Sequence, residues 1–201
     1  MWRKNRRINE KSEECTCNGV DLNRNYDSKW GGTGASHDCC ADSFCGEKVF
    51  SEFESENERV KIEELIKAGD LKMYLTFHSW SQLMIFPYGN EGIWSDDFVQ
   101  PENFDELDSL CNKTSEAITA VYGTEFLHGQ TVPTLGYPAA GGSDDWAMDA
   151  GLGLVYTFEC EYQLCFFSRF LQGLPRPRQN LVNLRHFRSS FGRKGSEKWR
   201  E

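Results

Sequence analysis

The segment KMYLTFHSWSQL, residues 72–83, joins an alternating apolar pattern to a single histidine. Met73, Leu75 and Phe77 occupy every second position, and this period of two predicts a buried β-strand. His78 stands at the end of that strand and is followed by polar residues and a tryptophan. Ligands of open α/β sheets bind at the carboxyl ends of strands. We therefore expect His78 to contact a ligand.

Three other segments have patterns that are typical of helices. In the first, Ser51 and Glu54 have the spacing of a capping box, and Gly69 is placed to end the helix. In the last, Ser143 is expected to be the N-cap residue. The apolar spacing predicts helices at residues 51–70, 102–123 and 141–151.

Two further apolar segments predict strands, and they complete the fold class. LMIF, residues 83–86, is stopped by Pro87, and LVYTFE, residues 154–159, places Glu159 at its end. Helices alternate with strands along the chain, so we predict an α/β fold with a mixed, mostly parallel sheet flanked by helices. Glu159 then lies at a strand end, as His78 does.

Composition and cysteine content limit the class of protein to which the chain can belong. With 201 residues, 39% of them hydrophobic and 13% aromatic, the chain is long enough for one packed domain. It has no apolar run of transmembrane length, and its first residues, MWRKNRRINEKSEEC, lack the apolar core of a signal peptide. Five of the eight cysteines lie between positions 15 and 45, with a spacing that fits a zinc module poorly. Their loop-rich surroundings favour disulfides in a secreted protein, which conflicts with the absent signal peptide.

The charge distribution divides the chain near residue 161. Residues 1–161 carry 13 Lys and Arg against 29 Asp and Glu, whereas residues 162–201 carry 9 against 2. The arginines of the basic segment are scattered among Leu, Phe and Pro, which does not indicate a nucleic-acid or membrane arm. We therefore expect neither nucleic acid nor membrane as a partner.

Zinc binding by His78 cannot be derived from local motifs. A catalytic zinc needs three protein ligands and one open position. The other histidines are His37, His128 and His186, and none of them begins an H-x-x-E or H-E-x-x-H motif. From the residues alone, a structural histidine is the favoured interpretation and a zinc ligand is the alternative.

A series of motifs along the chain changes this balance. WRKNR, GVDLNRNY, YLTFHSWSQ, PYG, YGTEF, YPAAGGSDDWAMD and TFE follow one another in this order. The series resembles the zinc metallocarboxypeptidases of the pancreatic carboxypeptidase A/B type over about residues 1–161. In carboxypeptidase A itself, two histidines and a glutamate hold the zinc. The resemblance implies the fold of these carboxypeptidases and a bound zinc ion. His78 matches the later of the two histidines that hold the zinc in the family.

The resemblance also implies that the copy is incomplete. The family's H-x-x-E pair, which supplies the other two zinc ligands, is absent from the chain and is expected upstream of Met1. Glu159, in TFE, matches the general base that takes a proton from the zinc-bound water as it attacks the peptide carbonyl. Arg3, in WRK, matches the arginine that stabilises the developing oxyanion.

Further residues match the substrate-binding groups of the family. Asn23 and Arg24 match the pair that binds the terminal carboxylate, for which a planar guanidinium is suited. Tyr137 matches the mobile tyrosine that closes over the substrate. Asp144 matches the base of the side-chain pocket, where B-like members have Asp, so the resemblance implies specificity for Lys and Arg. The alternative for Asp144 is an acidic residue that only favours the helix dipole.

The resemblance also assigns Ser79, Trp80 and two of the cysteines. Ser79 and Trp80 match the substrate cleft, and Trp80 stands where the family usually has Tyr. Cys17 and Cys40 match a disulfide of the family. The partners of the other cysteines stay open, among them Cys15, Cys39 and Cys45.

The resemblance ends after Glu159, where the charge reverses. We expect a partial catalytic domain at residues 1–161 and a divergent basic tail at 162–201. A frameshift, a retained intron or a misjoined exon would produce such a tail, and a new C-terminal segment is the alternative.

The predicted function is that of a zinc-dependent metallocarboxypeptidase. It would release C-terminal Lys or Arg from peptides or proteins, as an extracellular monomer. Because one imidazole cannot hold catalytic zinc, the 201-residue chain is expected to be inactive. The alternatives are a catalytically dead secreted domain that binds peptide C-termini and a non-functional translation.

Overall fold

The computed structural model describes residues 2–9, 15–90 and 99–160. The basic tail predicted at 162–201 lies outside these described residues. The elements along the chain are η1 (Leu22–Arg24), α1 (Phe53–Ala68), β1 (Tyr74–Ser79), β2 (Leu83–Phe86), α2 (Phe104–Tyr122), β3 (Leu127–Gln130), α3 (Thr131–Leu135), α4 (Ser143–Asp149) and β4 (Val155–Cys160).

The strands form one four-stranded sheet in the order β1-β4-β2-β3. The pairs β1·β4 and β2·β3 are parallel, and β2·β4 is antiparallel. The predicted α/β class with a mixed, mostly parallel sheet is therefore confirmed. In the parallel pair, His78 lies opposite Glu159, so two strands end with these side chains next to each other.

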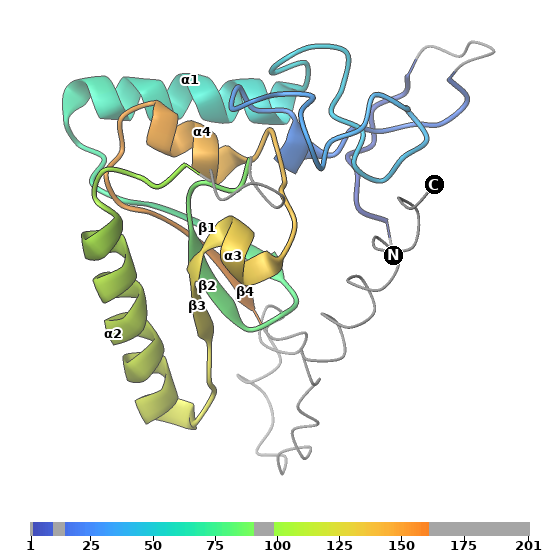
Figure 1. The fold of residues 1–201 in the computed structure, drawn as a ribbon. Helices are drawn as coiled ribbons and strands as arrows, with labels where there is room; N and C mark the ends of the chain where they lie inside the picture. The colour runs from blue at the N-terminus through green and yellow to red at the C-terminus, as the bar shows by residue number, and fades with distance from the viewer. Residues whose placement is uncertain (1, 10–14, 91–98, 161–201) are drawn as a thin grey trace, which may run out of the picture. The chain divides into compact units, whose positions relative to one another are not determined.

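Helices cover both faces of the sheet (Figure 1). On one face, α1 and α4 pack on β4 through Ile62, Trp146 and Val155. On the other face, α2 packs on β2 and β4 through Leu107 and Tyr156, among others. Because successive strand side chains point to opposite faces, each strand contributes to both cores. In β4 this alternation puts Val155, Thr157 and Glu159 on the α4 side.

Strand β1 differs from the prediction of a buried strand. It lies at the edge of the sheet, and Leu75 and Phe77 are 42% and 64% exposed. Phe77 only stacks on Phe158, with ring centroids 5.3 Å apart. The prediction was wrong because alternation identifies a strand but does not show whether other elements cover its apolar side. His78 points to the opposite face, together with Tyr74.

The helix ends are partly as predicted. Gly69 and Gly123 end α1 and α2 in the left-handed conformation, which glycine adopts without a steric penalty. The N-caps are not those expected from the sequence. Glu52 rather than Ser51 caps α1, and Gly142 rather than Ser143 caps α4. Neither cap uses its side chain.

Strand β3 and the short α3 were not predicted, because both are too short to show a clear periodicity. Within the described ranges, no helix is both long and apolar enough to cross a bilayer.

Candidate active site

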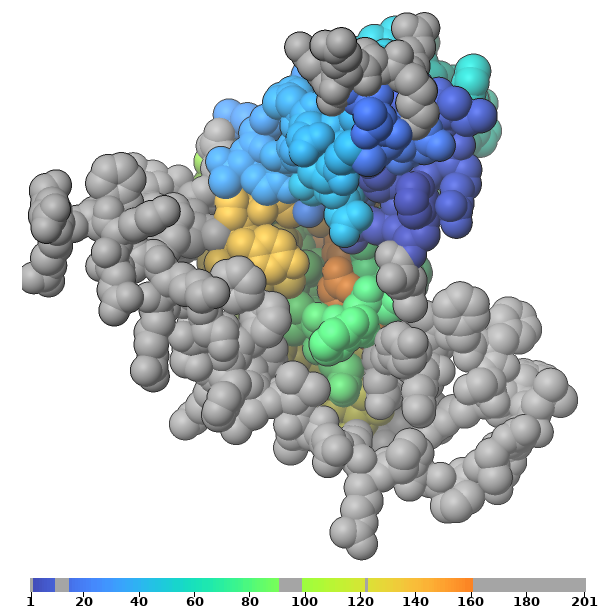
Figure 2. Space-filling view, turned by 90° about the vertical axis from the view of Figure 1, so that its right-hand side faces the viewer, coloured from blue at the N-terminus to red at the C-terminus, as the bar shows by residue number. Residues whose placement is uncertain are grey.

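A cavity of about 130 Å³ lies at the carboxyl ends of β1 and β4. Seven of the nine residues proposed from the sequence as catalytic, substrate-binding or metal ligands line it: Arg3, Asn23, Arg24, His78, Tyr137, Asp144 and Glu159. They come from segments that are far apart in the sequence. In Figure 2, the orange end of β4 lies in a hollow between the blue N-terminal segments and the yellow segment that follows β3. A larger, shallow groove between α2 and β3 contains none of these residues.

His78 and Glu159 face each other across the β1·β4 pair. The distance from His78 Nδ1 to Glu159 Oε1 is 4.0 Å, which is too long for a hydrogen bond. Burial raises the pKa of the Glu159 carboxyl to about 7, with Asp144 adding to the effect and Arg3 opposing it. Burial also lowers the pKa of His78. Burial thus disfavours the charged form of both side chains.

Arg3 is held by the aspartate that begins η1. Arg3 Nε donates to Asp21 Oδ2 at 2.8 Å, and Asp21 Oδ1 accepts from the backbone N–H of Asn23 at 3.2 Å. Asp21 is almost completely buried, whereas the Arg3 side chain is 45% exposed. A single carboxylate thus orients Arg3 and the short helix that carries Asn23 and Arg24.

Asn23 and Arg24 are held by backbone contacts. Arg24 Nε donates to the carbonyl of Gly34 at 3.0 Å and Nη1 to that of Asn23 at 2.6 Å. Asn23 Oδ1 accepts from the backbone N–H of Ser143, the first residue of α4. Gly141 lies against the same turn with a φ of +80°, and a Cβ there would stand 2.4 Å from the Arg24 carbonyl oxygen. The close approach requires glycine and brings η1 to α4.

Asp144 lies in the first turn of α4 with its carboxylate buried in the cavity wall. Its Oδ2 accepts a hydrogen bond from Thr157 Oγ1 at 2.7 Å. Asp145, next to it, also lines the cavity and accepts twice from the backbone N–H of Gly89, at 2.9 and 3.0 Å. The two adjacent aspartates therefore have different surroundings, and burial raises the pKa of Asp145 well above its ordinary value.

Three of the proposed site residues are more exposed. Tyr137 is 47% exposed and lines the cavity from the segment after α3. Ser79 and Trp80 do not line the cavity, and both are exposed, Trp80 to 58%.

The family model described as zinc carboxypeptidase matches residues 1–174. The chain belongs to the zinc carboxypeptidase family. The match extends beyond residue 161, where the motif series ends.

Individual proteins show similarity over the same part of the chain. Carboxypeptidase B of Bos taurus is 40% identical over 161 residues, which are 79% of this chain and 35% of that protein. Carboxypeptidase A2 of Rattus norvegicus is 38% identical over 190 residues, covering 92% of this chain and 42% of that protein. Bovine thrombin-activatable fibrinolysis inhibitor, solved in complex with tick carboxypeptidase inhibitor, is 36% identical with a TM-score of 0.69. The match covers 79% of this chain and 50% of that one. The chain spans about a third to a half of the length of these proteins.

Family membership implies zinc, but the described residues do not supply a complete site for it. His78 is the only histidine or cysteine that lines the cavity among the residues that the structure describes. The one cluster of three potential ligands in this part of the chain is Asp38, Cys39 and Cys40, and both cysteines are in disulfides. A zinc site with three protein ligands therefore does not fit the donors present.

The disulfides lie in the loops before α1. Cys17 pairs with Cys40, as the resemblance implies, and Cys15 pairs with Cys39, which the sequence left open. Cys45 is a buried free thiol.

Sequence reasoning did not name several lining residues of the cavity, among them Ile85, Gly89, Thr131, Asp145 and Thr157. A signal existed for Thr157, because it lies two positions before Glu159 on the same face of β4. The others face the cavity only through the packing of distant segments.

Proposed function

We propose that this chain is the part of a metallocarboxypeptidase that recognises and helps to cleave off a C-terminal Lys or Arg residue. The observation that supports this most is the cavity itself. It combines cationic Arg3 and Arg24, the amide of Asn23, and the carboxylates of Asp144 and Glu159 in one small volume. A free C-terminal basic residue has the complementary charges, an anionic carboxylate and a cationic side chain.

In this proposal Asn23 and Arg24 bind the terminal carboxylate. Arg24 is anchored through Nε and Nη1 to backbone carbonyls, which holds its guanidinium in place before the ligand arrives. The Asn23 Oδ1 contact with Ser143 likewise holds the Asn23 side chain. Tyr137, half-exposed at the entrance, would cover the bound residue.

Asp144 would bind the ammonium or guanidinium of the substrate. Its carboxylate is buried, and Thr157 occupies only one of its acceptor sites, so a cationic side chain gains a strong partner there.

Glu159 would act as the general base. With a pKa of about 7 it is partly ionised at neutral pH, and its Oε1 can take a proton from an attacking water. Arg3 would balance the negative charge that develops on the peptide oxygen. His78 would be one zinc ligand, with two more supplied from outside the residues described. The two disulfides support an extracellular location.

Substrate recognition can be tested without zinc. Titration calorimetry would compare a short peptide ending in Arg with its C-terminal amide and with a peptide ending in Glu. We expect the peptide with a free C-terminal Arg to bind most tightly, and we expect Asp144→Asn to weaken the binding of this peptide about thirtyfold. Asp149→Asn, isosteric and on the same helix but outside the cavity, should leave binding unchanged. Equal binding of the three peptides would refute the proposed specificity.

The second candidate is a domain that binds peptide C-termini without cleaving them. It is favoured because His78 is the single histidine in the cavity among the residues that the structure describes. We propose that residues 1–201 alone bind but do not hydrolyse. Metal analysis and an assay for released arginine test this. One tightly bound zinc per chain together with zinc-dependent release of arginine would show that the chain is a complete enzyme.

A further inference from the structure

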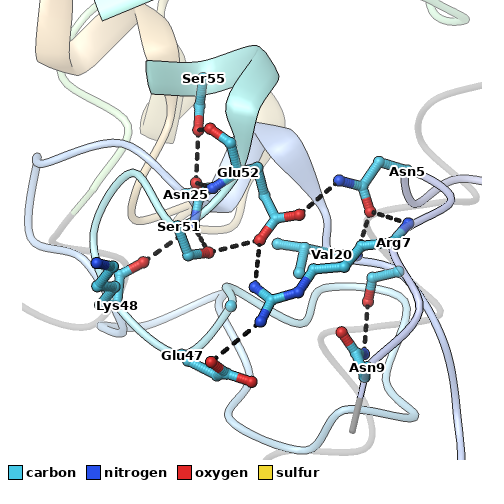
Figure 3. Close-up of polar contacts among 12 residues, drawn as sticks. Asn5, Arg7, Asn9, Val20, Asn25, Glu47, Lys48, Ser51, Glu52 and Ser55 are labelled. Carbon is cyan, nitrogen blue, oxygen red and sulfur yellow. Dashed lines mark hydrogen bonds and ion pairs between the residues drawn. The ribbon is translucent and has the colours of Figure 1, made fainter. Parts of the chain in front are cut away.

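A network of polar side chains surrounds the buried carboxylate of Glu52 (Figure 3). The Glu52 side chain is 2% exposed. Its Oε1 accepts from Arg7 Nη1 and from Ser51 Oγ, both at 2.7 Å, and its Oε2 accepts from Asn5 Nδ2 at 2.7 Å. Burial alone would raise the pKa of Glu52, but the hydrogen bonds of Ser51, Asn5 and Arg7 and the charge of Arg7 lower it. Glu52 is therefore an ionised, fully engaged carboxylate.

Glu52 holds the N-cap position of α1 but does not cap the helix with its side chain. The side chains that ordinarily accept there from the free N–H groups of the first turn are those of Ser, Thr, Asp and Asn. The Glu52 carboxylate instead accepts from Asn5 and Arg7. These contacts therefore join α1 to the N-terminal segment and do not cap the helix.

Asn25 continues the network toward the carboxylate-binding turn. Its side chain is completely buried, and Nδ2 donates to Ser51 Oγ at 3.0 Å and to the carbonyls of Cys45 and Lys48 at 2.8 and 3.1 Å. Oδ1 accepts from Ser55 Oγ at 2.6 Å. Since Asn25 directly follows Arg24, these bonds fix the backbone from which the Arg24 side chain starts.

The other end of the network reaches the segment that carries Arg3. Asn5, two residues later, donates its backbone N–H to the Val20 carbonyl at 2.8 Å, and the Val20 N–H donates to Asn5 Oδ1 at 2.8 Å. Arg3 and Arg24 are thus attached to the two arms of one network, and Glu52 joins the arms. Neither Glu52 nor Asn25 lines the cavity.

We propose that Glu52 and Asn25 are positioning residues that set the spacing between Arg3 and Arg24, and thereby the affinity of the cavity for a terminal carboxylate. This inference rests on the proposed function, because it assigns carboxylate binding to the same cavity. Ser51 is the intermediate link, since its hydroxyl donates to Glu52 and accepts from Asn25.

The test uses Glu52→Gln with Glu47→Gln as the matched control. Both glutamates pair with Arg7, but Glu47 is 62% exposed and has no contact with Asn5 or Ser51 among the described residues. Calorimetry on residues 1–201 would give the affinity for a peptide ending in Arg and for its C-terminal amide. We expect Glu52→Gln to lower the carboxylate-to-amide ratio about tenfold and Glu47→Gln to leave it unchanged.

A purely structural role would weaken both ligands by the same factor, so an unchanged ratio in folded Glu52→Gln overturns the inference. If that variant does not fold, the same ratio is measured for Ser51→Ala. This variant removes the hydroxyl that joins Glu52 Oε1 to Asn25 Nδ2 and leaves the Glu52 carboxylate paired with Arg7, and an unchanged ratio in it likewise overturns the inference. If the unmodified chain binds the peptide ending in Arg and its C-terminal amide equally well, the proposed function is refuted rather than this inference.

Discussion

Two buried polar clusters of this protein have opposite properties. Around Glu52, short hydrogen bonds reach both carboxylate oxygens, and the pKa of the acid is lowered. At the ends of β1 and β4, Glu159 and His78 stay 4.0 Å apart, and burial shifts the pKa of each toward its neutral form. The first cluster has its charge stabilised by the fold and holds the loops together. In the second, burial outweighs the favourable effect of Arg3 on the charge of Glu159, and a pKa shifted in this way is typical of groups that act on a ligand.

The largest expected effect is in the first cluster. Asn25→Ala removes a completely buried amide together with its hydrogen bonds to the carbonyls of Cys45 and Lys48 and from the Ser55 hydroxyl, so the free energy of unfolding should fall by about 3–5 kcal/mol. Urea unfolding followed by circular dichroism measures this. Asn57→Ala, at an exposed position of α1, is the control and should change stability by less than about 0.5 kcal/mol. Similar values for both variants would contradict the view that this network holds the loops.

The second prediction is a gain of stability, in the cluster at the ends of β1 and β4. The fold raises the pKa of Glu159 to about 7, so the folded state holds its proton more tightly than the unfolded chain does. The free energy of unfolding should therefore fall as the pH rises from the ordinary pKa of a glutamate to about 7. Glu159→Gln should therefore be more stable than the unmodified chain by about 1–3 kcal/mol at pH 8, and the difference should vanish below pH 4. Unfolding is measured with a chelator present, so that metal plays no part. A loss of stability at pH 8 would show that the ionised carboxylate has a structural partner.

The smallest expected effect is the pH dependence of the first cluster. The lowered pKa of Glu52 means that its contribution is present above its ordinary pKa and is lost as the pH falls through the folded value. The stability difference between the unmodified chain and Glu52→Gln should therefore shrink below about pH 4.5. Glu47→Gln, tested alongside, should show little change because Glu47 is largely exposed. If the stability difference between the unmodified chain and Glu52→Gln instead grew toward low pH, the Glu52 charge would not be stabilised by the fold.

Much of the fold and the site could be predicted because the signals are local. The period of two placed β1 and β4, and glycines after the apolar spacing placed the ends of α1 and α2. His78 and Glu159 end their strands, and parallel pairing brings such ends together. The motif series indicated the family that the comparison then showed.

What only the tertiary structure decided involves distant segments. The sequence could not show that Leu75 and Phe77 would be exposed, since the cover of a strand comes from other elements. It could not place Trp80 outside the cavity, nor pair Cys15 with Cys39. Residue type and spacing determine local geometry and the chemistry that is present. Which charges are buried, and which of those are satisfied, depends on contacts such as those of Glu52 with Asn5 and Arg7, across more than forty positions of the chain.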